Sequence, residues 1–136
     1  MSVFTHFAAG ALAGALIPNP IAAPFVGLGS HLLLDMIPHR DIDDYRVEIV
    51  LWLIAMIILF VGGAYSIAIV LCGLFAVLPD LENLLWKTGK IRDSQKIFPG
   101  HRKGLIRHGR KTGTWSSVLQ VAFTAVVIVW MIRRNG

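Results

Sequence analysis

The chain has 136 residues, enough for one domain, and 55% of them are hydrophobic while only 15% are charged. Its mean hydropathy is +0.66, and a soluble domain of this size cannot hide so much apolar side chain because its surface must stay wet. The single cysteine, Cys72, excludes a disulfide framework and a zinc site built from cysteines. Composition therefore favours an integral membrane protein.

Five apolar segments predict five helices. In chain order they cover about residues 3–17, 21–37, 47–61, 65–86 and 114–132. Pro-Asn-Pro at 18–20 and Pro38 end the first two segments, and two glycines at 62–63 make a tight turn before the fourth. A polar stretch at about 87–113 precedes the fifth. We expect an all-α, polytopic transmembrane helical bundle that forms a single domain over residues 1–136.

The first two segments are short for a membrane span of about 20 residues. We therefore expect helix tilt, a thinned bilayer or a helical hairpin of limited depth there. The first four residues, Met-Ser-Val-Phe, carry no Lys or Arg, so we expect a retained helix rather than a secretory signal. Gly10 and Gly14 lie four apart among alanines, a composition that allows another helix to approach closely.

The cations predict the orientation of the bundle. Nine of the 13 Lys and Arg residues fall within 87–111, and two more, Arg40 and Arg46, lie in the loop after the second helix. Five spans put both loops and the N-terminus on one side, which the positive-inside rule makes cytoplasmic. We expect a multi-pass protein of the cell (inner) membrane with a basic cytoplasmic loop at about 87–113. The net charge of +5 favours anionic lipid headgroups over nucleic acid as the partner at that face.

Four ionisable side chains lie inside apolar segments, where a charge is costly and marks a functional candidate. They are His6, His31, Asp35 and Asp80. His31 and Asp35 are four residues apart and share one helical face. That spacing suits two ligands of one metal ion, or one ligand and the carboxylate that orients it.

Three further features accompany these residues. His39 follows one turn later and joins the same face if the helix continues past Pro38. Pro79 is expected to bend the fourth helix and to free a backbone carbonyl near Asp80. Glu82 is expected to face elsewhere unless that bend rotates it.

With five spans, all five histidines fall at one end of the bundle. Imidazole and carboxylate ligands suit Zn²⁺, Mn²⁺ or Fe²⁺, and we expect one or two ions. A bound ion lowers the pKa of its water toward about 7, which favours hydrolysis of a phosphoester or ester in a lipid. The predicted site has metal ligands His6, His31, Asp35 and Asp80; acid–base histidines His39, His101 and His108; and phosphate-binding cations Arg102, Lys103 and Arg107.

Short motifs at these positions resemble those of the membrane-bound metal-dependent hydrolase family of small bacterial and archaeal proteins. The matching elements are Thr-His at 5–6, Leu-Pro-Asp-Leu-Glu at 78–82, and His-Arg-Lys-Gly at 101–104 with His108. The stretch at 29–39 also looks like the His-x-x-x-Asp-x-x-Pro-His element of small zinc phospholipase C-like membrane proteins. The resemblance implies a membrane-embedded metal-dependent hydrolase.

Other hypotheses stay open. The chain could be a non-catalytic helical module that assembles with itself or with a larger membrane complex, its His and Asp pairs serving as hydrogen bonds between helices. An ion or proton path is less favoured, because the loops of the opposite face offer no ionisable residue for an exit.

Overall fold

The computed structural model describes residues 1–102 and 112–135. In this part of the chain the regular secondary structure consists of helices alone, joined by turns and loops. The elements are α1 (Val3–Leu16), α2 (Ala23–Asp35), α3 (Tyr45–Val61), α4 (Ile67–Val77), α5 (Asp80–Lys87), the 3₁₀ turn η1 (Asp93–Gln95) and α6 (Trp115–Asn135). The predicted all-α class is confirmed for the described residues.

The predicted fourth helix is interrupted at its proline. α4 ends at Val77 and α5 begins at Asp80, with a turn at Leu78 and Pro79 between them. Proline has no backbone N–H to continue the helical ladder, and its ring clashes with the preceding turn. The interruption sets the direction of α5, and with it the positions of the two carboxylates that follow Pro79.

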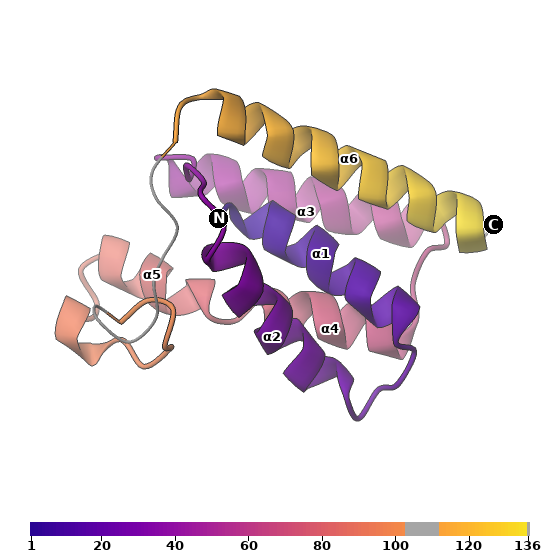
Figure 1. The fold of residues 1–136 in the computed structure, drawn as a ribbon, viewed down its shortest axis with the longest axis horizontal. Helices are drawn as coiled ribbons and strands as arrows, with labels where there is room; N and C mark the ends of the chain where they lie inside the picture. Colours follow the sequence, from indigo (N-terminus) through magenta and orange to yellow (C-terminus); the bar gives the residue numbers. More distant parts are fainter. Residues whose placement is uncertain (103–111, 136) are drawn as a thin grey trace.

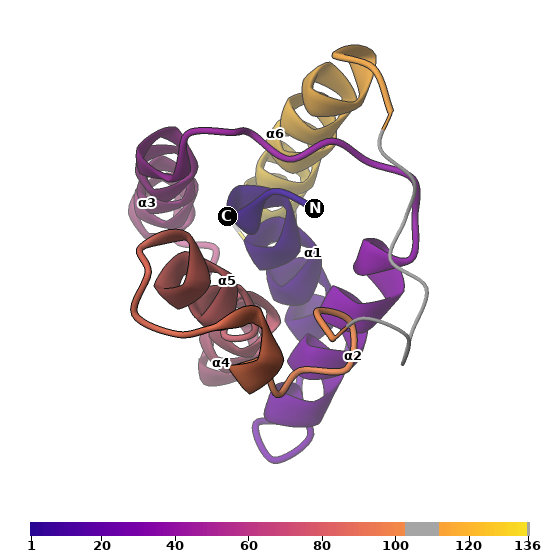
Figure 2. The ribbon, with the colours of Figure 1, turned by 90° about the vertical axis from the view of Figure 1, so that its left-hand side faces the viewer.

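α1 is the central helix of the bundle. It packs against α2, α3, α4 and α6, and Figure 2 shows it in the middle of the other helices when the molecule is viewed end-on. Figure 1 shows α5 and the start of α6 at one end of the molecule, with the C-terminus at the other. Successive long helices therefore alternate in direction, as the five predicted segments require.

Glycines let α1 and α2 approach α4 closely, as the sequence predicts for Gly10 and Gly14. A Cβ added to Gly10 would lie 2.5 Å from the Cβ of Ala76, and one added to Gly14 would lie 2.6 Å from the carbonyl oxygen of Ala68. In α2, a Cβ on Gly27 would lie 2.4 Å from the carbonyl oxygen of Cys72. These contacts hold the backbones of three helices together next to the site described below.

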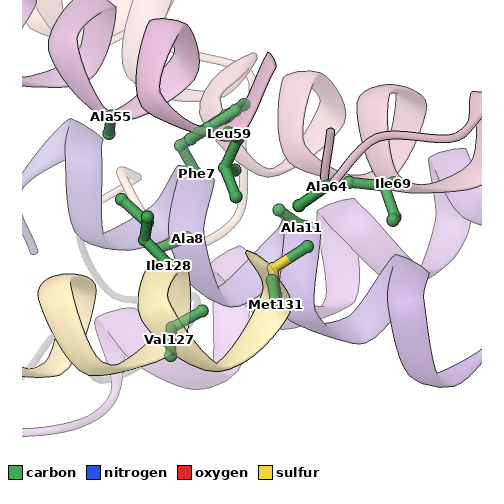
Figure 3. Packing of buried hydrophobic residues seen from close by; sticks show 10 residues of the cluster. All are labelled: Phe7, Ala8, Ala11, Ala55, Leu59, Ala64, Ile69, Val127, Ile128 and Met131. Atoms are coloured by element: carbon green, nitrogen blue, oxygen red, sulfur yellow. The ribbon is translucent and has the colours of Figure 1, made fainter. Parts of the chain in front are cut away.

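The apolar core lies where α1 meets α3, α4 and α6 (Figure 3). Its buried members are Phe7, Ala8, Ala11, Ala55, Leu59, Ala64, Ile69, Val127, Ile128 and Met131. Four of the ten are alanines, so the helices meet at short range. The large apolar side chains on the outside remain exposed, including Ile21 and Val61 at 84% each.

Two helices in the described residues are long and apolar enough to cross a membrane: Ile67–Lys87, which joins α4 and α5, and Trp115–Arg134 in α6. α1 is apolar but has only 14 residues. Many exposed large apolar side chains are what a surface facing lipid or a partner presents. These findings are consistent with association with a membrane, and the full five-span topology belongs to the proposal below.

Candidate metal centre

Three buried side chains from two helices meet where α1 and α2 pack together. Nε2 of His6 in α1 lies 3.2 Å from Oδ1 of Asp35, and Nε2 of His31 lies 3.1 Å from Oδ2 of the same carboxylate. The rings of His6 and His31 are stacked, with centroids 3.9 Å apart. His6 and His31 are fully buried and Asp35 is 2% exposed. One carboxylate therefore contacts both stacked imidazoles, and His31 and Asp35 meet as their spacing of four residues predicts.

His101 joins this group from the loop that follows η1. Its Nε2 lies 3.3 Å from Oδ2 of Asp35 and 3.3 Å from Nε2 of His31. Three imidazole Nε2 atoms therefore face one carboxylate. The sequence assigns His101 to acid–base chemistry, whereas in the structure it lies among the predicted ligands.

Hydrogen bonds on the far side of two rings fix which nitrogen faces the centre. Nδ1 of His31 donates to the carbonyl oxygen of Ala76 at 2.7 Å, and Nδ1 of His101 donates to Oε1 of Glu82 at 3.0 Å. Because these partners only accept, Nδ1 of each ring carries a proton and Nε2 is the nitrogen that faces the centre. Second partners of this kind orient histidine ligands in metal sites and raise their basicity.

Glu82 is the residue that the sequence misses. It also accepts the backbone N–H groups of Ile97 and Phe98, at 2.7 and 3.0 Å. It thereby holds the loop that carries His101 against α5. The sequence predicts that Glu82 faces elsewhere unless the bend at Pro79 rotates it. The turn at Leu78 and Pro79 meets that condition, and the Glu82 side chain reaches His101.

Asp80 lies at the edge of the centre. One of its oxygens is 4.0 Å from Nδ1 of His31, and the other is 3.9 Å from Nε2 of His101. The expected free carbonyl is found one turn before Pro79, where Ala76 accepts from His31. The last carbonyls of a helix have no partner within it, and α4 ends at Val77.

Two overlapping groups in the described residues could hold a metal ion: His6, His31 and Asp35, and His31, Asp80 and His101. Within each group the ligand atoms lie within 4.8 Å of one another. Buried imidazoles, a carboxylate between them and a second layer of acceptors fit a transition-metal ion. All four predicted ligands belong to these groups, and His101 is added to them.

His39 takes a different place from the predicted one. α2 ends at Asp35, so His39 does not continue its face. The side chain is buried, with Nδ1 bonded to the carbonyl oxygen of Ile37 at 2.7 Å and Nε2 lying 3.3 Å from Oδ1 of Asp41. His39 belongs to neither group of candidate ligands.

The terminal amino group of Met1 connects the loop that carries His39 and Asp41 to the centre. It lies 2.9 Å from Oδ1 of Asp35 and 3.1 Å from Oδ1 of Asp41. Burial lowers the pKa of this amine, but the carboxylates of Asp35, Asp41 and Asp80 outweigh burial and raise it above its ordinary value. Burial has the opposite effect on the carboxyl of Asp41 and raises its pKa. The hydrogen bond with His39 and the nearby ammonium outweigh burial and bring this pKa below its ordinary range.

A cleft of about 1320 Å³ opens beside the centre. Asp35, Asp80 and His101 lie in its polar part, and most of its remaining wall is apolar. The exposed Arg102, one of the predicted phosphate-binding cations, lines the cleft together with Lys87. The other predicted cations, Lys103 and Arg107, and the predicted acid–base residue His108 lie outside the described residues.

No protein-family model, curated protein or solved structure matches the chain. The functional conclusion therefore depends on the geometry of the centre. A cluster of imidazoles and carboxylates beside an open cleft can bind a divalent ion and present it to a ligand. The adjoining cations can attract an anionic group.

Proposed function

We propose that the protein is a metal-dependent hydrolase that acts on a lipid or lipid-linked phosphoester at the cytoplasmic face of the cell membrane. The observation that carries the proposal is the convergence of His6, His31, Asp35, Asp80 and His101 from α1, α2, α5 and one loop. Such a set is costly to bury and is retained where it binds something. The resemblance of the local motifs to membrane-bound metal-dependent hydrolases agrees with it.

The donor set favours zinc, with Mn²⁺ or Fe²⁺ as substitutes and room for one or two ions. Three imidazoles and a carboxylate are a borderline ligand set that suits these metals. The ion would supply a hydroxide at neutral pH. Asp35 would bind the ion and orient the histidine ligands. Glu82 would hold the proton of His101 on Nδ1, so that Nε2 is free to bind the ion.

The cations of the cleft and the proposed position of the protein in the membrane suggest the class of substrate. Arg102 and Lys87 line the same cleft as Asp80 and His101, so a phosphate bound by the cations would lie beside the ligands. The proposed topology has five spans, the N-terminus in the cytoplasm and the C-terminus outside. It places the cleft at the level of the headgroups, where anionic phospholipids are available.

Purified protein in detergent tests the proposal directly. Elemental analysis is expected to find a stoichiometric transition metal, and a panel of phospholipids and lipid pyrophosphates is expected to give chelator-sensitive release of a headgroup or phosphate. The Asp35→Asn variant should lose both metal and activity while keeping its helical circular dichroism. The hydrolase is ruled out if the wild-type protein contains no stoichiometric metal and folded Asp35→Asn has the same metal content and the same hydrolytic activity as the wild type.

The direct contacts of Asp35 with three histidines support a second candidate, a non-catalytic helical module. In that case the pairs fasten α1, α2 and the loop of His101 together for assembly with a second copy or with a larger complex. This candidate predicts that His31→Ala unfolds the protein or dissociates an oligomer and that chelators have no effect.

A further inference from the structure

We propose that the cleft continues into a groove between α3 and α4 that holds the acyl chain of an anionic phospholipid, with the headgroup at the His/Asp centre. This inference rests on the proposed function for the chemistry at the headgroup. It adds the place where the acyl chain of the substrate would lie. The groove itself is defined by two cavities and by the helices that line them.

Polar and apolar side chains both line the cleft. Asp80 and His101 line it from α5 and the loop that follows, Glu48, Ile49 and Trp52 line it from α3, and Leu74 and Val77 line it from α4. A ligand that fills the cleft therefore needs both polar and apolar groups. A free phosphate or a water-soluble ester would leave the apolar wall exposed.

A second cavity extends the apolar part away from the centre. It has a volume of about 240 Å³, and no polar side chain except Tyr65 lines it. Leu74 lines both cavities, and Met56 of α3 and Ile69 of α4 lie on opposite walls of the second one. The two cavities therefore meet at Leu74, and residues of α3 and α4 line both.

The central helix forms the floor of the proposed groove. α3 and α4 both pack on α1, and α1 supplies Val3 to the first cavity and Phe7 to the second. Ile69 and Asp80 are eleven residues apart, which is about 16 Å along a helix. That length matches about half of the ~30 Å hydrocarbon core of a bilayer, the depth that the acyl chains of one leaflet occupy.

Two groups at the mouth suit an anionic glycerolipid. Lys87 and Arg102 are exposed cations beside the centre, where they can bind a phosphate. Nε1 of Trp52 is buried without a hydrogen-bond partner among the described residues, and Trp52 lines the cleft one helical turn after Glu48. An indole N–H there can donate to the ester carbonyl of an acyl chain.

Photocrosslinking to the full-length chain in nanodiscs tests the groove without requiring turnover. The probe is phosphatidic acid with a diazirine near the end of one acyl chain, and peptide mapping locates the label. We expect label on the groove faces of α3 and α4, near Met56 and Ile69. Leu74→Trp should reduce this label roughly tenfold, equivalent to about 1.4 kcal/mol of binding.

Matched variants keep the result interpretable. Ile67→Trp adds the same indole to α4 at a position that is 70% exposed and lines neither cavity, and it should label like the wild type. Met56→Trp narrows the groove from α3 and replaces Leu74→Trp if the latter does not fold. Label on the outer surface of α6 that neither groove variant changes would overturn the proposal.

The Asp35→Asn variant separates this inference from the proposed function. It should lose hydrolysis and keep the groove label, because Asp35 lines the first cavity and not the second. Groove label in wild-type protein that hydrolyses no lipid would refute the hydrolase and support the groove. The opposite result is also possible: the protein hydrolyses lipid in a chelator-sensitive way, but Leu74→Trp changes neither the KM nor the labelling pattern. That result would refute the groove and support the hydrolase.

Discussion

Nε2 of His31 and Nε2 of His101 lie 3.3 Å apart although 70 residues separate them in the chain. His31 is fixed by α2, which packs tightly on α4 through Gly27. His101 is fixed by a loop that Glu82 holds through two backbone N–H groups. The centre is therefore completed only when the loop after α5 docks against the bundle.

Alanine substitutions of histidines should separate ligands from neighbours. His31→Ala and His101→Ala each remove an Nε2 that faces Asp35, so each is expected to lose most of the bound metal. His39→Ala should keep it, because His39 belongs to neither candidate group. Elemental analysis of protein that elutes as the wild type does on size exclusion measures this. Equal metal content in all three variants would disprove the ligand assignment.

Replacing Glu82 tests whether the second layer of the site matters. In Glu82→Gln the acceptor for Nδ1 of His101 loses its charge. Metal affinity should fall by roughly 10–100-fold, the usual cost of losing such a partner. Competition with a fluorescent chelator provides the measurement. Asp43→Asn, at a side chain that is 92% exposed, is the control and should bind metal like the wild type; a Glu82→Gln variant that does the same would contradict the assigned role.

Glycine substitutions probe the packing of α1 on α4. Gly10→Ala brings a Cβ to 2.5 Å from the Cβ of Ala76 and 2.7 Å from the carbonyl oxygen of Cys72. The helices must move apart, and we expect a loss of about 1–3 kcal/mol of stability, as for other overpacked cores. Gly29→Ala is the matched control, since nothing lies within 4 Å of its added Cβ. Thermal unfolding in detergent compares the two, and equal melting temperatures would contradict the close approach.

Cysteine labelling tests the proposed orientation. In a Cys72→Ala background, Lys90→Cys in the basic loop should react with a membrane-impermeant maleimide only in inside-out vesicles. Arg134→Cys near the C-terminus should react in intact cells. Both positions are exposed, so protection reports the membrane rather than burial in the protein. Labelling of both positions from the same side would exclude an odd number of spans between them.

Local sequence determined the helices. Apolar blocks ended by prolines and glycines define the boundaries of α1, α2, α3 and α6 to within a few residues of those predicted, because these breakers act on the backbone where they stand. The face shared by His31 and Asp35 also follows from helical periodicity alone. The candidate ligands His6, His31, Asp35 and Asp80 also follow from local sequence, because each is an ionisable group within an apolar segment, where burial is costly.

Only the tertiary structure decided which polar groups meet. The interruption at Pro79 is local, but the direction of α5 after it depends on packing, and so the orientation of Glu82 could not be predicted from spacing. His101 and His39 are both polar residues in loops and look alike in the sequence. The docked loop brings His101 to Asp35, while the end of α2 leaves His39 beside Asp41. Periodicity fixes neighbours within one helix, whereas contacts between distant segments depend on how whole helices pack.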